Sequence, residues 1–127
     1  MTTGNGLSPS VLVVDDDLDL LLLIHFKLKA AGFRAMTSLN GEKVWEIISQ
    51  TRPDLVLLDI QMKGIFGNDI CKKIKANPLT AGIPVLLFSA NDNIDIITKE
   101  CGADGFITKP LKDEHFRNTL QQYLAVG

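Results

Sequence analysis

Three consecutive aspartates follow directly on an apolar run near the start of the chain. Residues 11–17 read VLVVDDD, and a second apolar run, LVLLD, ends in Asp59. Burying carboxylates costs free energy unless something compensates their charge. A divalent cation is the cheapest compensation where carboxylates converge, and Mg²⁺ takes one or two carboxylates together with water and phosphate oxygens. Asp15, Asp16 and Asp59 are therefore candidate magnesium ligands.

Two further polar side chains stand at the ends of apolar runs. Ser89 ends the segment VLLFS, and Lys109 follows the segment FIT. A lysine can pair with a carboxylate and later with a phosphoryl oxygen, and a serine hydroxyl can donate to the same oxygen. An aspartate held between a metal ion and an ammonium group is suited to attack phosphorus, with both cations neutralising the charge that develops. These residue types indicate phosphoryl transfer onto Asp59.

Apolar runs that alternate with amphipathic stretches must position these side chains. Residues 55–58 and 85–88 are apolar at consecutive positions, as in parallel strands that are buried on both faces. Five repeats of strand and helix predict one α/β domain, in which helices cover both faces of a parallel sheet and ligands bind at the carboxyl ends of the strands. The predicted strands are Val11–Asp15, Arg34–Met36, Leu55–Asp59, Val85–Ser89 and Gly105–Thr108, and the predicted helices are Leu18–Ala31, Gly41–Gln50, Gly67–Ala76, Ile94–Cys101 and Asp113–Leu124.

Length and composition limit the class of protein. The 127 residues suffice for one domain, which we place at residues 10–125 after a flexible leader over residues 1–9. A net charge of −2 offers no basic patch for nucleic acid. Cys71 and Cys101 are expected to be reduced packing residues, and no apolar run is long enough to cross a membrane. We expect a cytoplasmic globular domain that binds neither nucleic acid nor membrane.

The polar segments together resemble the receiver domain of two-component response regulators, the CheY-like family. The resemblance covers about Val11 to Leu124 and rests on VLVVDDD, PDLVLLDIQM, VLLFSA and GADGFITKP in that order. It implies a doubly wound, flavodoxin-like fold of five strands in the order 2-1-3-4-5 with five helices. It also implies that Asp59 accepts a phosphoryl group from a histidine kinase or a histidine phosphotransfer protein, which switches a partner-binding surface.

The resemblance assigns roles around Asp59. Asp16 would bind Mg²⁺ directly and Asp15 through water, while Asp59 and the backbone carbonyl of Gln61 would complete the protein ligands. The domain would modify and dephosphorylate only itself, so it would not be an enzyme with an external substrate.

The resemblance also places a switch on the last strands. Ser89 and Lys109 would contact the phosphoryl group. Phe106 would change rotamer together with Ser89, although plain core packing is an equal alternative for this side chain. The dipeptide Lys109-Pro110 resembles the cis-proline turn of the family.

Two segments depart from the family pattern. Lys63 stands where the family usually has a proline, four residues after Asp59. The helix expected at 94–101 has a weak pattern and should be short or irregular, which puts dimerisation through that face in doubt. The oligomeric state is left open.

The first predicted helix carries more leucine than one buried stripe can use. Surplus apolar surface marks an interaction site, so we expect the phosphodonor to dock here, at Leu18 and Leu22. The alternative is that some of these leucines pack under the N-terminal leader.

Other functions remain as alternatives at this point. A flavodoxin-like electron carrier would share the sheet order, but the acidic loop after the first strand would repel a cofactor phosphate. A metal-dependent phosphatase with an aspartyl nucleophile, and a receiver fold that binds partners without phosphorylation, are the others. His25, His115 and Trp45 are interpreted as ordinary helix residues, and Asp17 or Asp19 as a helix cap.

Overall fold

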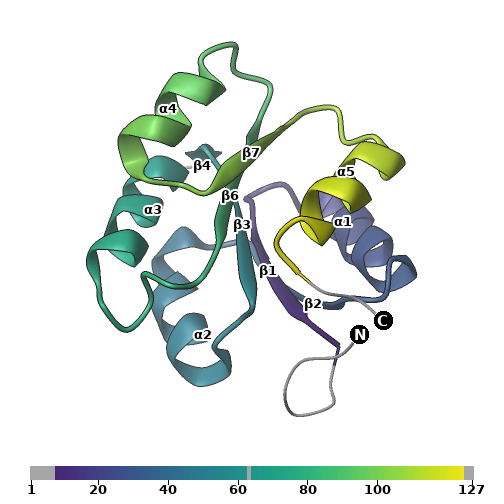
Figure 1. Ribbon diagram of the computed structural model, residues 1–127, viewed down its shortest axis with the longest axis horizontal. Helices are drawn as coiled ribbons and strands as arrows, with labels where there is room; N and C mark the ends of the chain where they lie inside the picture. The colour runs from purple at the N-terminus through teal and green to yellow at the C-terminus, as the bar shows by residue number, and fades with distance from the viewer. Residues whose placement is uncertain (1–7, 63, 125–127) are drawn as a thin grey trace.

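A parallel five-stranded sheet forms the centre of the protein (Figure 1). The structure, a computed structural model, describes residues 8–62 and 64–124. The strand order β2-β1-β3-β6-β7 is the predicted order 2-1-3-4-5, because β4 and β5 form a separate hairpin. The strands of the sheet are β1 (Ser10–Val14), β2 (Arg34–Ser38), β3 (Leu55–Asp59), β6 (Val85–Ser89) and β7 (Gly105–Thr108).

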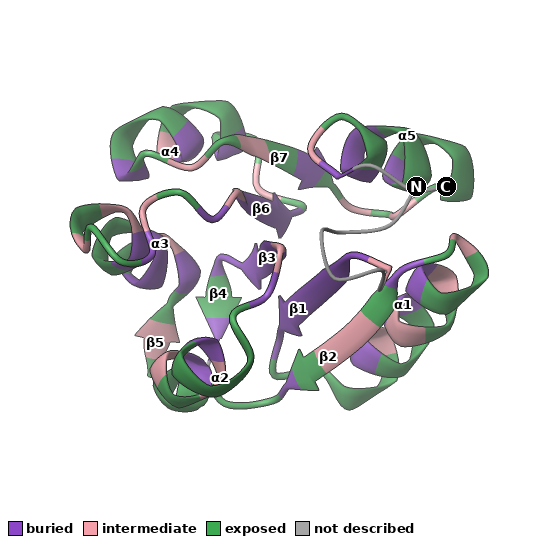
Figure 2. Ribbon diagram, turned by 60° about the horizontal axis from the view of Figure 1, so that its bottom comes forward, coloured by how far each residue is buried: buried purple, intermediate pink, exposed green. Residues whose placement is uncertain are grey.

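Helices cover both faces of the sheet, as the alternation of elements predicts. Helices α1 and α5 lie on one face, and α2, α3 and α4 lie on the other (Figures 1 and 2). The helices are α1 (Leu18–Ala30), α2 (Val44–Thr51), α3 (Gly67–Ala76), α4 (Ile94–Cys101) and α5 (Asp113–Gln121), and a 3₁₀ turn, η1 (Gly41–Lys43), precedes α2.

The central strands are buried on both faces, which explains their continuous apolar runs. Along β1, Leu12 and Val14 pack with the α2–α3–α4 layer, whereas Val11 and Val13 pack with the α1–α5 layer. All five residues of β1, β3 and β6 are buried. Alternate side chains of these strands pack into the two opposite cores, so neither face of the strands contacts solvent. Polar and apolar residues therefore do not alternate along them.

Several element boundaries differ from the predicted ones, and strand pairing explains the largest difference among the strands. β2 is longer than Arg34–Met36, because Thr37 and Ser38 continue the ladder beside β1 up to Val14. The predicted helix Gly41–Gln50 divides into η1 and α2. α5 ends at Gln121 instead of Leu124, α1 ends one residue earlier than predicted, and β1 both begins and ends one residue earlier. α4 is short, as predicted, but regular.

The hairpin formed by β4 (Gln61–Met62) and β5 (Ile65–Phe66) was not predicted. Each strand has two residues, which is too short for a periodic pattern. Lys63, which stands where the family usually has a proline, lies outside the described residues. The same holds for residues 1–7 of the predicted leader.

The structure confirms the cap predicted at the start of α1 and shows a glycine turn at its end. The carboxylate of Asp17 caps the helix by accepting a hydrogen bond from the N–H of Leu20. At the other end, Gly32 has φ of 93°, and the N–H of Phe33 returns to the carbonyl of Leu28. This is a Schellman turn, for which glycine is the favoured residue because a left-handed backbone suits it best.

Among the described residues, no helix is long and apolar enough to span a membrane.

Candidate functional site

The sheet brings four of the singled-out side chains to one edge. Asp15 follows β1, Asp59 ends β3, Ser89 ends β6 and Lys109 follows β7. The strands are parallel and in close register, with Asp59 beside Phe88 on the neighbouring strand. Their carboxyl ends therefore converge, as expected for the ligand edge of an open α/β sheet.

The carboxylates form the compact acidic cluster that the sequence predicts. Asp15, Asp16 and Asp59 each offer an oxygen within 4.8 Å of the others. Asp15 is 1% exposed and Asp59 is 6% exposed, whereas Asp16 is exposed. The N–H of Asp17 donates to Oδ1 of Asp15 at 3.0 Å, which fixes the orientation of this carboxylate.

This donor set fits a magnesium ion. Oδ2 of Asp15 is buried and accepts no hydrogen bond from the described residues. A buried carboxylate oxygen without a donor is costly, and a hard cation is a suitable partner for it. Asp16 supplies a further oxygen that solvent, and hence a hydrated ion, can reach.

Lys109 lies between the two buried carboxylates. Its ammonium group donates to Oδ1 of Asp59 at 3.3 Å and lies 3.6 Å from Oδ2 of Asp15. The same nitrogen lies 4.8 Å from the centre of the Phe88 ring, a favourable position for a cation. One lysine thus balances part of the negative charge of two aspartates.

The pKa of Asp59 is raised to about 6, mainly by burial and secondly by the charge of the nearby Asp15, while Lys109 opposes both effects. Burial also raises the pKa of Asp15, against the hydrogen bond from Asp17 and the charge of Lys109. Charged carboxylates are disfavoured here in the absence of a second cation. A cation that binds at this edge would relieve that penalty.

Ser89 is buried but lines an open cleft at this edge of the sheet. Its Oγ accepts a hydrogen bond from the N–H of Asn91 at 3.0 Å, so the hydroxyl proton can still be donated to a ligand. The backbone carbonyl of Ser89 accepts from the N–H of Lys109 at 3.0 Å, which ties the ends of β6 and β7 together. The cleft is lined by Asp59, Gln61, Ser89, Ala90, Asn91 and Lys109.

The other residues to which the resemblance assigns a role lie at or next to this cleft. Gln61 lines the cleft from β4, so it is at the site, although a role of its carbonyl stays a prediction. Phe106 is 38% exposed on β7 and borders a neighbouring hollow with Asn91 and Lys109, so plain core packing does not describe it. The peptide bond between Lys109 and Pro110 is cis, as the resemblance implies.

Gly67 is a site residue that the sequence reasoning missed. Its N–H donates to the carbonyl of Ile60 at 2.7 Å. A Cβ at this position would lie 1.9 Å from the backbone oxygen of Asp59, closer than any side chain could fit. The available signal was a glycine at the start of a predicted helix, where a cap or a better helix former is more usual.

A comparison with known families shows which family the chain belongs to. The sequence profile of the response regulator receiver domain matches residues 11–121. The chain belongs to this family. Two-component signalling by a receiver domain therefore replaces the alternatives of an electron carrier and a phosphatase.

Individual relatives agree with this membership. The chain is 34% identical over 121 residues to the transcriptional regulatory protein AfsQ1 of Streptomyces coelicolor, covering 94% of this chain and 52% of AfsQ1. It is 36% identical over 104 residues to the DNA-binding response regulator MtrA of Mycobacterium tuberculosis, covering 80% of this chain and 44% of MtrA. The chain thus spans about half the length of these relatives.

A solved structure shows the same receiver fold. The crystal structure of a putative response regulator from Chloroflexus aurantiacus superposes with a TM-score of 0.85 at 27% sequence identity, covering 91% of this chain and 96% of the other.

Proposed function

We propose that this receiver domain accepts a phosphoryl group on Asp59 in a Mg²⁺-dependent reaction. The observation that carries the proposal is the grouping of Asp59 with Asp15 and Asp16, within 4.8 Å, beside the ammonium group of Lys109. Asp59 is the member that both ends a strand and lines the open cleft, so an incoming phosphoryl group can reach it.

The chemistry is a substitution at phosphorus. A carboxylate oxygen of Asp59 forms a bond to phosphorus while the bond from phosphorus to the donor histidine nitrogen breaks. With a pKa of about 6, Asp59 is about 90% ionised at pH 7, so the nucleophilic form predominates. Mg²⁺, held by Asp15, Asp16, Asp59 and the carbonyl of Gln61, would supply positive charge to the phosphoryl oxygens. Lys109 supplies a second positive charge.

The phosphoryl group would then be read through Ser89 and Lys109. The hydroxyl of Ser89 is free to donate to a phosphoryl oxygen, and the N–H of Asn91 is bonded to that same hydroxyl. A shift of Ser89 would therefore move the start of the loop before α4. Phe106, which borders the hollow beside this loop, would change rotamer in response.

The phosphodonor in this proposal is a sensor histidine kinase or a histidine phosphotransfer protein in the cytoplasm. It would dock at the start of α1, where Leu18 and Leu22 are 54% and 49% exposed. α1 begins directly after the acidic loop, so a partner there could present its phosphohistidine to Asp59. The domain would carry out no chemistry on other substrates and would lose the phosphoryl group by hydrolysis.

The docking part is tested by transfer from a histidine-phosphorylated donor to the native protein and to Leu22→Glu. We expect transfer to Leu22→Glu to fall about tenfold or more, because a charge would be buried at the interface. Leu79→Glu is the matched control, since Leu79 is 76% exposed in the loop after α3. Equal transfer to Leu22→Glu and the control would contradict docking at α1, while labelling by acetyl phosphate would still report on Asp59.

A further inference from the structure

α1 presents an apolar face to solvent in addition to the face that it buries. Leu21, Ile24 and Leu28 face the sheet. On the outer side, Leu22 is 49% exposed and Phe26 is 67% exposed, and Figure 2 shows the exposed side of this helix turned away from the sheet. Leu18 and Leu23 flank them and are about half exposed. Contiguous apolar surface of this kind marks an association site.

The exposed face has a symmetric order of residues. A stripe along this face consists of Asp19, Leu22, Phe26 and Lys29. Successive members are three, four and three positions apart, which is the spacing of residues that line the seam between paired helices. All four are exposed. The two apolar residues are central, with an acid at the N-terminal end and a base at the C-terminal end. The two charges lie about 15 Å apart along the helix.

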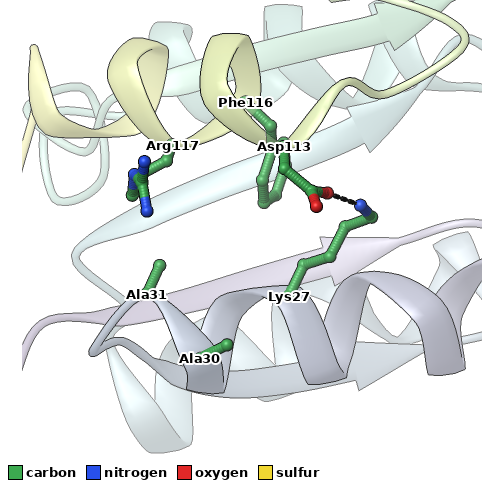
Figure 3. A pocket seen from close by; sticks show the side chains of 6 residues that line it. All are labelled: Lys27, Ala30, Ala31, Asp113, Phe116 and Arg117. Carbon is green, nitrogen blue, oxygen red and sulfur yellow. Dashed lines mark hydrogen bonds and ion pairs between the residues drawn. The ribbon is translucent and has the colours of Figure 1, made fainter.

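The two end charges have no partner within the described part of the chain. Asp19 and Lys29 make no side-chain hydrogen bond or ion pair with residues 8–62 or 64–124. Lys27, by contrast, points across to α5 and pairs with Asp113, beside the groove between these helices (Figure 3). Lys29 is therefore the base that the end of α1 offers to another molecule.

We propose that α1 pairs in antiparallel orientation with α1 of a second copy of this chain. A two-fold axis at the level of Ile24 places Leu22 opposite Phe26 of the second copy and Asp19 opposite Lys29 of the second copy. The symmetry generates each contact twice, as an isologous interface requires. Antiparallel packing also sets the positive end of each helix dipole beside the negative end of the other.

The symmetric order of residues along the stripe is the reason why we infer a second copy of this chain as the binding partner of α1. A helix of unrelated sequence has no reason to need an acid and a base at equal distances from the centre of the face. The stripe has four residues, whereas a standard interface uses roughly 20–30 residues on each side, so the dimer is weak and depends on concentration. Because Leu22 also belongs to the proposed docking site, a phosphodonor and a second copy would exclude each other.

Charge reversal tests the pairing directly. In Asp19→Lys, both ends of the stripe are positive, and in Lys29→Asp both are negative, so each variant repels its own copies. In an equimolar mixture, every lysine of one variant faces an aspartate of the other. Sedimentation equilibrium from about 5 to about 500 μM should show self-association of the native protein. The association constant should fall by about tenfold or more in each variant alone and should return toward the native value in the mixture.

α4 offers matched controls for these substitutions. Asp95 and Lys99 are exposed, in the first and last turns of α4, so Asp95→Lys and Lys99→Asp carry the same charge changes elsewhere. They should leave self-association unchanged, and circular dichroism should show folded protein for all four variants. A native protein that stays monomeric throughout, or a mixture that fails to recover, would overturn the pairing. Asp59→Asn should dimerise like the native protein, so failure of the proposed phosphorylation would not affect this test.

Discussion

The ammonium nitrogen of Lys109 lies 3.3 Å from Oδ1 of Asp59, at the end of a different strand of the sheet. The two residues are fifty positions apart in the sequence, and Lys109 also lies 3.6 Å from Asp15. Lys109 thus lowers the electrostatic cost of ionising two buried carboxylates at once. The ionisation of Asp59 depends on that balance of charge.

Removing the lysine should raise the pKa of Asp59. In Lys109→Met, burial and Asp15 act without the opposing charge, so the pKa should rise above its native value of about 6. A titration of the carboxyl carbon by ¹³C NMR, in EDTA, measures this directly. Lys112→Met removes a neighbouring exposed lysine and should leave the titration of Asp59 as it is. An unchanged pKa in Lys109→Met would mean that Lys109 does not stabilise the ionised form.

The pKa of Asp59 also makes stability depend on pH. Its folded value of about 6 lies above the ordinary 3.8, so between these pH values the native state binds more protons than the unfolded state. Asp59 therefore lowers the free energy of unfolding as pH rises through this range. Asp59→Asn should be more stable than the native protein above about pH 7, by at most about 3 kcal/mol, and should lose this advantage near pH 4.

Urea denaturation in EDTA at about pH 4 and about pH 7.5 checks this prediction. Asp95→Asn is the control, since it removes an exposed carboxylate of α4 and should change stability by less than about 0.5 kcal/mol at either pH. A stability difference for Asp59→Asn that stays the same at both pH values would contradict a raised pKa.

Magnesium should stabilise the folded protein through the acidic cluster. At a concentration one hundred times its dissociation constant, Mg²⁺ should add about 2.7 kcal/mol to the free energy of unfolding. Asp16→Asn should lose most of this gain. Asp17→Asn removes a charge one residue away and keeps the helix cap, because asparagine caps as well as aspartate. If both variants respond to Mg²⁺ like the native protein, the ion does not bind at Asp16.

Gly67 should be essential for the geometry around Asp59. In Gly67→Ala, the new Cβ would lie 1.9 Å from the backbone oxygen of Asp59, so the end of β3 or the start of α3 must move. We expect a loss of about 1–3 kcal/mol in the free energy of unfolding, together with slower phosphorylation. Gly82→Ala, where a Cβ meets nothing within 4 Å, should change neither. Native-like behaviour of Gly67→Ala would show that the contact is not restrictive.

The sequence was sufficient for the five-stranded sheet and for the approximate place of its five strands and five helices. Leu55–Asp59 and Val85–Ser89 were predicted with their observed bounds because strands buried on both faces are apolar throughout. Polar residues directly after such strands then had to meet at one edge, as Asp15, Asp59 and Lys109 do.

What could not be predicted depends on tertiary contacts. The β4–β5 hairpin has two residues in each strand, which leaves no periodicity to detect. The extension of β2 to Ser38 exists because β1 is beside it, not because of its own residues. The close approach of Gly67 to Asp59 joins a helix to a strand end. These three features depend on contacts between segments that are not encoded in the local pattern of residue types.

The most direct test of the phosphoacceptor is the intact mass of the native protein and of Asp59→Asn after incubation with Mg²⁺ and acetyl phosphate. We expect the native protein to gain one phosphoryl group, to gain none in EDTA, and Asp59→Asn to gain none under either condition. Equal phosphorylation of both proteins would place the acceptor elsewhere. If the native protein gains no phosphoryl group although Mg²⁺ binds, the domain is a receiver fold that binds partners without phosphorylation, and the central claim is wrong.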